Sequence, residues 1–104
     1  MTVTAFLSVA PATEESMAPA VADAVDALEA FDVEYETTPA GTIIEADTAA
    51  AVFAAAQAAH EAVEADRVGT LLKLDDKRTT DEPAAQKVEA VETELGRPAR
   101  SRRE

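Results

Sequence analysis

The first residues of the chain alternate strictly between apolar and polar side chains. One face of residues 2–9 holds Val3, Ala5, Leu7 and Val9, and the other holds Thr2, Thr4, Phe6 and Ser8. A period of two residues is that of a half-buried β-strand. Pro11 ends this predicted strand, because proline has no N–H for the ladder.

A helical period follows this strand. The segment 13–16 offers polar and acidic residues suited to the first turn of a helix. Apolar residues then recur at intervals of three and four: Met17, Val21, Val25, Leu28 and Phe31. This pattern predicts a helix that runs to about Ala30, with those residues as its buried stripe.

Two short strands are predicted next. Val33, Tyr35 and Thr37 alternate with polar residues, Thr38–Gly41 has the composition of a turn, and the segment 42–46 is short and β-branched. We therefore expect a hairpin.

An alanine-rich helix is predicted from Asp47 and Thr48 to about Asp66. Its expected buried stripe is Val52, Phe53, Ala56, Ala59 and Val63. Residues 67–75 alternate again, with Leu71 and Lys73 opposite the core-facing positions. A last helix follows Pro83, carries Val88, Val91 and Leu95 at helical spacing, and stops at Gly96.

The element order β-α-β-β-α-β predicts an α+β, ferredoxin-like fold: a four-stranded antiparallel sheet with helices on one face and an extra C-terminal helix. The other face of the sheet would show Thr4, Phe6, Ser8, Leu71 and Lys73. Because this surface is too apolar to be left wholly in water, we expect it to dock on another copy of the chain.

Composition narrows the function. The 104 residues include 9 Lys and Arg against 21 Asp and Glu, a net charge of −12, with one His and no Cys. Cysteine nucleophiles and thiolate metal sites are excluded, and binding nucleic acid is disfavoured because phosphates need a basic surface. The acid excess is typical of halophilic proteins, whose carboxylate shell stays hydrated in concentrated salt.

The chain divides into a domain, residues 1–96, and a basic tail, residues 97–104, which holds four Arg and one Glu. We expect the tail to be disordered or to lie on the acidic body. No segment has the apolar length of a membrane span or a signal peptide, which favours a cytoplasmic protein.

Three residues could carry binding chemistry. Glu45 lies on an expected interior strand, where burying a carboxylate without a partner is costly. Its carboxylate therefore either pairs with Lys73 or Arg67, is exposed to solvent at the strand end, or binds a ligand. His60 can pair with Glu64 one turn away, or contact a ligand or subunit. Asp76 fits ion pairing at the strand end better than ligand or interface contact, and metal binding least.

The motifs Gly41–Asp47, Ala58–Val63 and Arg67–Arg78, in this order, resemble those of the small thiamine-binding protein family. The resemblance covers about residues 2–95, but a Met that commonly precedes Gly41 is absent and Lys77 stands where Arg is usual. It implies a ferredoxin-like fold, a homotetramer built by packing sheets, and binding of thiamine or its hydroxymethylpyrimidine part without catalysis, metal or cofactor. The acid-rich composition suggests a haloarchaeal member.

Thiamine joins a thiazolium cation to an aminopyrimidine, so its site needs apolar walls, hydrogen-bonding groups and a negative field. We expect Glu45 to pair with the aminopyrimidine, and Phe6 or Tyr35 to stack on a ring. The other expected ligand residues are Thr42, Thr37 and Ser8 through their hydroxyls, and His60 and Asp76 from their motif positions. The alternatives are a structural or regulatory homo-oligomer that binds a protein partner, or a regulator that binds another effector.

Overall fold

A four-stranded antiparallel sheet with the order β2-β3-β1-β4 forms the centre of the computed structural model, which describes residues 1–102. The elements are β1 (Thr2–Pro11), α1 (Ala18–Ala27), a 3-10 turn (Leu28–Ala30), β2 (Glu34–Thr37), β3 (Thr42–Ala46), α2 (Ala49–Ala62), β4 (Val68–Lys77) and α3 (Ala85–Leu95). This is the expected β-α-β-β-α-β order with an added C-terminal helix, and it confirms the ferredoxin-like α+β fold. No helix among the described residues is both long enough and apolar enough to cross a bilayer.

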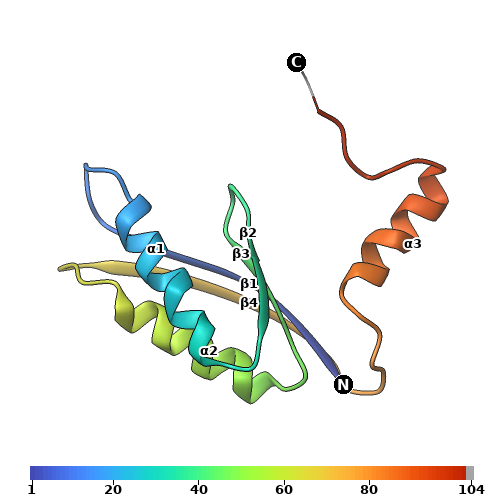
Figure 1. Cartoon of the computed structure of the whole chain (residues 1–104), viewed down its shortest axis with the longest axis horizontal. Helices are drawn as coiled ribbons and strands as arrows, with labels where there is room; N and C mark the ends of the chain where they lie inside the picture. The colour runs from blue at the N-terminus through green and yellow to red at the C-terminus, as the bar shows by residue number, and fades with distance from the viewer. Residues whose placement is uncertain (103–104) are drawn as a thin grey trace.

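Helices α1 and α2 lie together on one side of the sheet (Figure 1). The core between them and the sheet consists of Val3, Ala5, Leu7, Val9, Ala24, Leu28, Ile44, Ala46, Val52, Ala55, Ala56, Ala59 and Val63. The alternation of β1 therefore directs its odd-numbered residues to the helices, as the sequence predicts. Because many of the core residues on α2 are alanines, α2 can lie close to the sheet.

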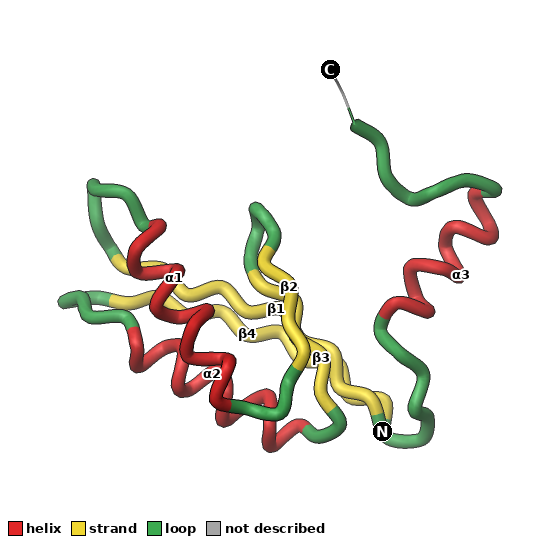
Figure 2. Tube along the Cα trace, viewed as in Figure 1, coloured by secondary structure: helices red, strands yellow, loops and turns green. Residues whose placement is uncertain are grey.

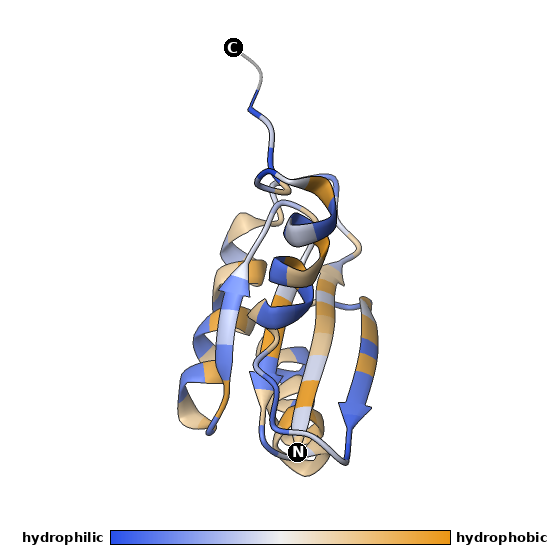
Figure 3. Ribbon diagram, turned by 90° about the vertical axis from the view of Figure 1, so that its right-hand side faces the viewer, coloured by the Kyte–Doolittle hydropathy of each residue, from blue (hydrophilic) through white to orange (hydrophobic). Residues whose placement is uncertain are grey.

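Beyond its first turn, helix α3 stands apart from α1, α2 and the sheet (Figure 2). Its apolar residues remain about half exposed, with Val88 at 54%, Val91 at 50% and Leu95 at 44%. Apolar and hydrophilic patches alternate along this helix (Figure 3). Gly96 ends it in the left-handed conformation, with φ of 69°.

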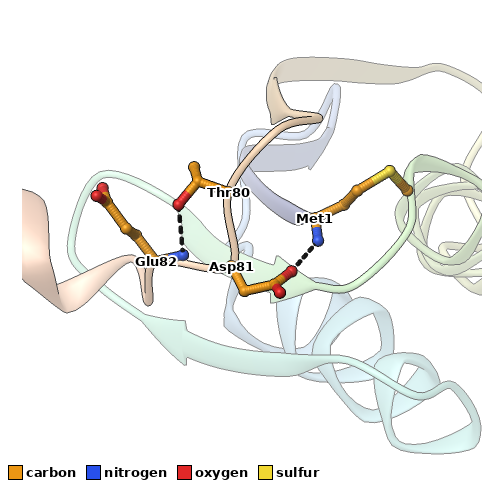
Figure 4. Close-up of polar contacts among 4 residues, drawn as sticks. All are labelled: Met1, Thr80, Asp81 and Glu82. Atoms are coloured by element: carbon orange, nitrogen blue, oxygen red, sulfur yellow. Dashed lines mark hydrogen bonds and ion pairs between the residues drawn. The ribbon is translucent and has the colours of Figure 1, made fainter.

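The connection between β4 and α3 is held at the start of β1. The Met1 ammonium group donates to the Asp81 carboxylate, and Glu82 N–H donates to the Thr80 hydroxyl at 3.2 Å (Figure 4). The hydrogen bond from the Met1 ammonium group, together with its positive charge, lowers the pKa of the Asp81 carboxyl group. On the open face of the sheet, Glu45 Oε2 accepts from Ala84 N–H at 3.0 Å. The start of α3 is thereby fixed over the open face of the sheet.

Two expectations about the helices were wrong. Phe53 is 57% exposed, because the α2 face toward the sheet is formed by Val52, Ala55, Ala56 and Ala59, about a quarter turn away. Helix α1 has no acids in its first turn and no side chain capping its Met17 position. It begins at Ala18, later than the polar segment 13–16 suggested, and Met17 is 47% exposed.

The last strand is longer than expected, and part of the predicted tail lies outside the described residues. Strand β4 extends to Lys77, two residues past the predicted end, because it pairs with β1 as far as Thr2. In the tail, Ala99 N–H donates to Glu92 Oε2 at 2.9 Å. Residues 103–104 of the predicted tail lie outside the described part of the chain.

Candidate functional site

A cavity of about 160 Å³ lies between α1 and the turn that joins β2 to β3. We call it the α1–turn cavity. Its apolar wall comes from α1 and the 3-10 turn, and its other wall comes from β1 and the β2–β3 hairpin. The apolar wall consists of Met17, Val21, Ala24, Val25 and Leu28. The other wall consists of Leu7–Ala10 and Thr37–Thr42. Three of the predicted ligand residues, Ser8, Thr37 and Thr42, line this cavity. The alternation of β1 turns the Ser8 side chain to the opposite face of the sheet, so only the hydroxyls of Thr37 and Thr42 face the cavity.

The edge of β1 is open inside this cavity. Pairing between β1 and β3 ends at Leu7 and Thr42, whereas β1 itself continues to Pro11. Past Leu7, the backbone groups of β1 that face β3 have no ladder partner. Free N–H and C=O groups of a strand edge can bind a flat ligand that carries its own donors and acceptors.

Two threonine hydroxyls face each other at the start of this hairpin. Thr37 Oγ1 and Thr42 Oγ1 are 3.2 Å apart and share a hydrogen bond. Thr42 is only 5% exposed, while Thr37 is exposed. Since a hydroxyl both donates and accepts, this pair can exchange its mutual bond for bonds to a ligand.

The turn itself is held by its own hydrogen bonds. Thr38 Oγ1 donates to the Gly41 carbonyl at 2.7 Å, and Thr38 N–H donates to the same carbonyl at 2.9 Å. A Cβ atom on Gly41 would lie 2.5 Å from Phe6 Cζ and 3.0 Å from the Leu7 carbonyl oxygen. Glycine is required at this position because the Phe6 ring packs directly against the backbone.

The segment of the chain that forms the α1–turn cavity is acidic. All of its residues fall between 7 and 42, and the chain has no Lys or Arg before Arg67. The same stretch holds eight Asp or Glu. None of these carboxylates lines the cavity itself, but a cation bound there would lie within a strongly acidic segment of the chain.

The aromatic candidates lie elsewhere. Phe6 is on the opposite, open face of the sheet, under the turn. Tyr35 donates its hydroxyl to Glu29, and that hydrogen bond, together with partial burial and the negative charges of Glu29 and Asp26, raises the pKa of Tyr35. Neither ring lines the α1–turn cavity.

Glu45 is also separate from the two threonine hydroxyls of the α1–turn cavity. It lines a different, polar hollow with Asp32, Glu34 and Asp47, and its carboxylate caps the start of α3 through Ala84. The sequence predicted an interior strand for Glu45, which the sheet order confirms. Its observed partner is a backbone N–H, not Lys73 or Arg67.

His60 and Asp76 each have a partner of their own. His60 Nδ1 shares a hydrogen bond with the Thr70 hydroxyl on β4, instead of pairing with Glu64. Asp76 Oδ2 accepts from Arg78 Nε at 3.2 Å, while Asp76 Oδ1 is buried with no hydrogen-bond partner. Within residues 1–102 no cluster of three His, Asp or Glu side chains could hold a metal ion.

Sequence reasoning missed the apolar wall and the open strand edge. Val21 and Val25 were assigned to the core, yet both stay partly exposed because they face the cavity. The available signal was the unequal length of the predicted strands, residues 2–9 for the first and 42–46 for the third. An unpaired extension of the longer strand follows from that difference.

A family model and one related protein each match most of this chain. The model of the family described as thiamine-binding protein matches residues 5–92. A UPF0045 protein of Methanothermobacter thermautotrophicus is 41% identical over 98 residues, which cover 89% of this chain and 99% of that protein.

Two solved structures share the fold. A hypothetical protein of Methanocaldococcus jannascii matches with a TM-score of 0.79 and 28% identity, over 86% of this chain and 95% of the other. A Thermotoga maritima protein, named as a candidate thiamine biosynthesis/salvage protein, matches with a TM-score of 0.74 and 21% identity, over 88% and 99% of the two chains.

Proposed function

Because the chain belongs to the thiamine-binding protein family, we propose that it binds thiamine, or the hydroxymethylpyrimidine half of thiamine, without catalysing a reaction. The observation that carries this proposal is the α1–turn cavity, which joins apolar walls, two facing threonine hydroxyls and an open strand edge. These are the groups that an aminopyrimidine ring requires.

The size of the cavity decides which part of thiamine enters. At about 160 Å³ it is smaller than the roughly 300–1,000 Å³ typical of sites that enclose a whole drug-sized ligand. We therefore place the pyrimidine inside, against the β1 edge, and the thiazolium at the mouth. There the cation lies in the negative field of a segment that has acids and no bases.

Thr42 gives the sharpest test of this placement. Thr42→Val keeps the shape of the side chain but removes the hydroxyl, and we expect thiamine affinity to fall about tenfold, or 1.4 kcal/mol. Thr2→Val is the matched control, since Thr2 and Thr42 are the two buried polar residues of the described chain and only Thr42 lines this cavity. Titration calorimetry of both variants in concentrated salt makes the comparison.

Two results would contradict the placement. Wild-type protein that shows no saturable heat with thiamine or hydroxymethylpyrimidine removes the proposed function. Saturable binding that Glu45→Gln weakens tenfold, while Thr42→Val leaves it unchanged, moves the ligand to the hollow beside Glu45.

We also propose that the chain assembles with itself, as a homotetramer, through the part of the open sheet face that α3 leaves uncovered. Leu71 on β4 is 61% exposed there, and the apolar stripe of α3 is unpartnered within the described chain. Burying such surfaces against a second copy would enlarge a core that is small for one chain. Sedimentation in concentrated salt that gives the mass of a single chain would refute this assembly.

A further inference from the structure

All three lysines of the chain, Lys73, Lys77 and Lys87, line one cavity on the open face of the sheet. This lysine cavity has a volume of about 180 Å³ and lies between β1, β4 and the first turn of α3. The protein has 21 acids and only nine bases, so a cavity lined by three lysines differs from most of its surface. Three ammonium groups at one hollow are suited to binding an anion.

The register of β1 and β4 brings two of these lysines onto the same face. Lys77 lies opposite Thr2, and Lys73 lies opposite Phe6. Lys87 reaches the cavity from α3, whose start is fixed over the sheet by the hydrogen bond from Ala84 N–H to Glu45. The cavity is therefore built from two strands and a helix that the chain holds together.

The lysines are poorly neutralised by the protein. Among residues 1–102, Lys77 has one ion pair, with Glu82 at 3.8 Å, and neither Lys73 nor Lys87 has a carboxylate within 4.0 Å. Asp75 and Glu82 also line the cavity, so its ammonium groups outnumber its carboxylates by one. A weak, half-exposed pair such as Lys77–Glu82 costs little to exchange for a stronger one.

Neutral groups complete the cavity. Thr2 is 6% exposed, and neither its hydroxyl nor that of Thr4 takes part in a side-chain hydrogen bond within residues 1–102. Phe6 and Ile43 supply an apolar floor beside them. Ammonium groups and hydroxyls are donors to phosphate oxygens, and an apolar floor suits an attached organic group.

We propose that the lysine cavity binds the phosphate group of a small phosphate monoester, with the organic part of the ester over Phe6 and Ile43. This site is on the opposite face of the sheet from the α1–turn cavity, so it does not depend on the proposed thiamine binding. Lys73, Lys77 and Lys87 bind the phosphate oxygens, and Thr2 and Thr4 donate their hydroxyls.

The test is calorimetric titration with inorganic phosphate and with phenyl phosphate, at constant chloride and ionic strength. We expect saturable binding at one site per chain, with phenyl phosphate tighter because of the apolar floor. Lys73→Gln and Lys87→Gln should each weaken binding about tenfold or more. Arg97→Gln is the matched control, since it changes the net charge equally but removes a cation that does not line the cavity.

Circular dichroism confirms that each variant is folded, and sedimentation is measured on the same samples. The proposal is wrong if phosphate shows no saturable binding, or if Arg97→Gln weakens binding as much as the lysine variants do. It is also wrong if phenyl phosphate binds no tighter than inorganic phosphate. Absence of phosphate binding, together with a mass that falls on Lys73→Gln, would show that an acidic segment of a second copy occupies the cavity.

Discussion

Replacing Gly41 with alanine tests the contact that links the turn of the α1–turn cavity to the open face of the sheet. The new methyl group would lie 2.5 Å from Phe6 Cζ, 2.7 Å from Phe6 Cε1 and 3.0 Å from the Leu7 carbonyl oxygen. Carbon atoms in good contact are about 3.5–4.0 Å apart, so the ring must move by about 1 Å. The Leu7 carbonyl belongs to an interior strand and cannot move as easily.

Overpacking of this kind typically costs about 1–3 kcal/mol, and we expect Gly41→Ala to destabilise the fold by about 2 kcal/mol. For a domain near 100 residues, that corresponds to a fall in Tm of about 8–16 °C. Gly69→Ala is the control, because a Cβ there meets only the Ala10 carbonyl oxygen, at an ordinary 3.9 Å. It should be neutral or slightly stabilising.

Unfolding by heat and by denaturant, followed by circular dichroism, measures both variants. A double-mutant cycle with Phe6→Ala identifies the cause, since removing the ring should relieve most of the cost of Gly41→Ala. The reasoning is refuted if Gly41→Ala costs as much in the Phe6→Ala background as in the wild type, or if Gly69→Ala is equally destabilising.

Two further predictions concern Tyr35 and helix α2. Tyr35 is the only tyrosine and the chain has no tryptophan, so its phenolate absorbance should titrate with a midpoint above about 10, and Glu29→Gln should lower that midpoint. Because the folded state holds the Tyr35 proton more tightly, this proton stabilises the fold below about pH 10, and that stabilisation is lost as the pH rises through the folded pKa of Tyr35. A titration midpoint that Glu29→Gln does not change would contradict the role of the Glu29 hydrogen bond. In α2, Val52 is fully buried and Phe53 is 57% exposed, so Val52→Ala should cost about 2 kcal/mol in denaturant unfolding and Phe53→Ala less than about 0.5. The reverse ranking would mean that α2 is rotated on the sheet.

Most of the fold was predictable because the alternation in β1 and β4 and the helical spacing in α1 and α3 are local signals. The error at Phe53 has a physical cause. In a helix of alanines almost any side may face the core, and a phenylalanine next to a valine cannot be assigned from apolarity alone. Packing against the sheet chose Val52 and the alanines, since they allow the closer approach.

The candidate site was predicted only in part. Thr37 and Thr42 are paired across the hairpin, so their meeting follows from the predicted turn. The Ser8 side chain alternates to the opposite face of the first strand, which the sequence pattern also predicts. The partner of Glu45 could not be predicted, because a backbone N–H at the start of α3 lies 39 residues away in sequence. Nor does any local pattern show that three lysines on two elements share a cavity.

The most direct test of thiamine binding in the α1–turn cavity is amide chemical-shift mapping of the labelled protein during titration with thiamine. We predict the largest shifts at residues 8–10, at Thr37–Thr42 and in the first two turns of α1, with little change in α3. Largest shifts around Glu45 or along β4 would contradict this placement, and a spectrum unchanged at saturating thiamine would contradict the proposed function itself.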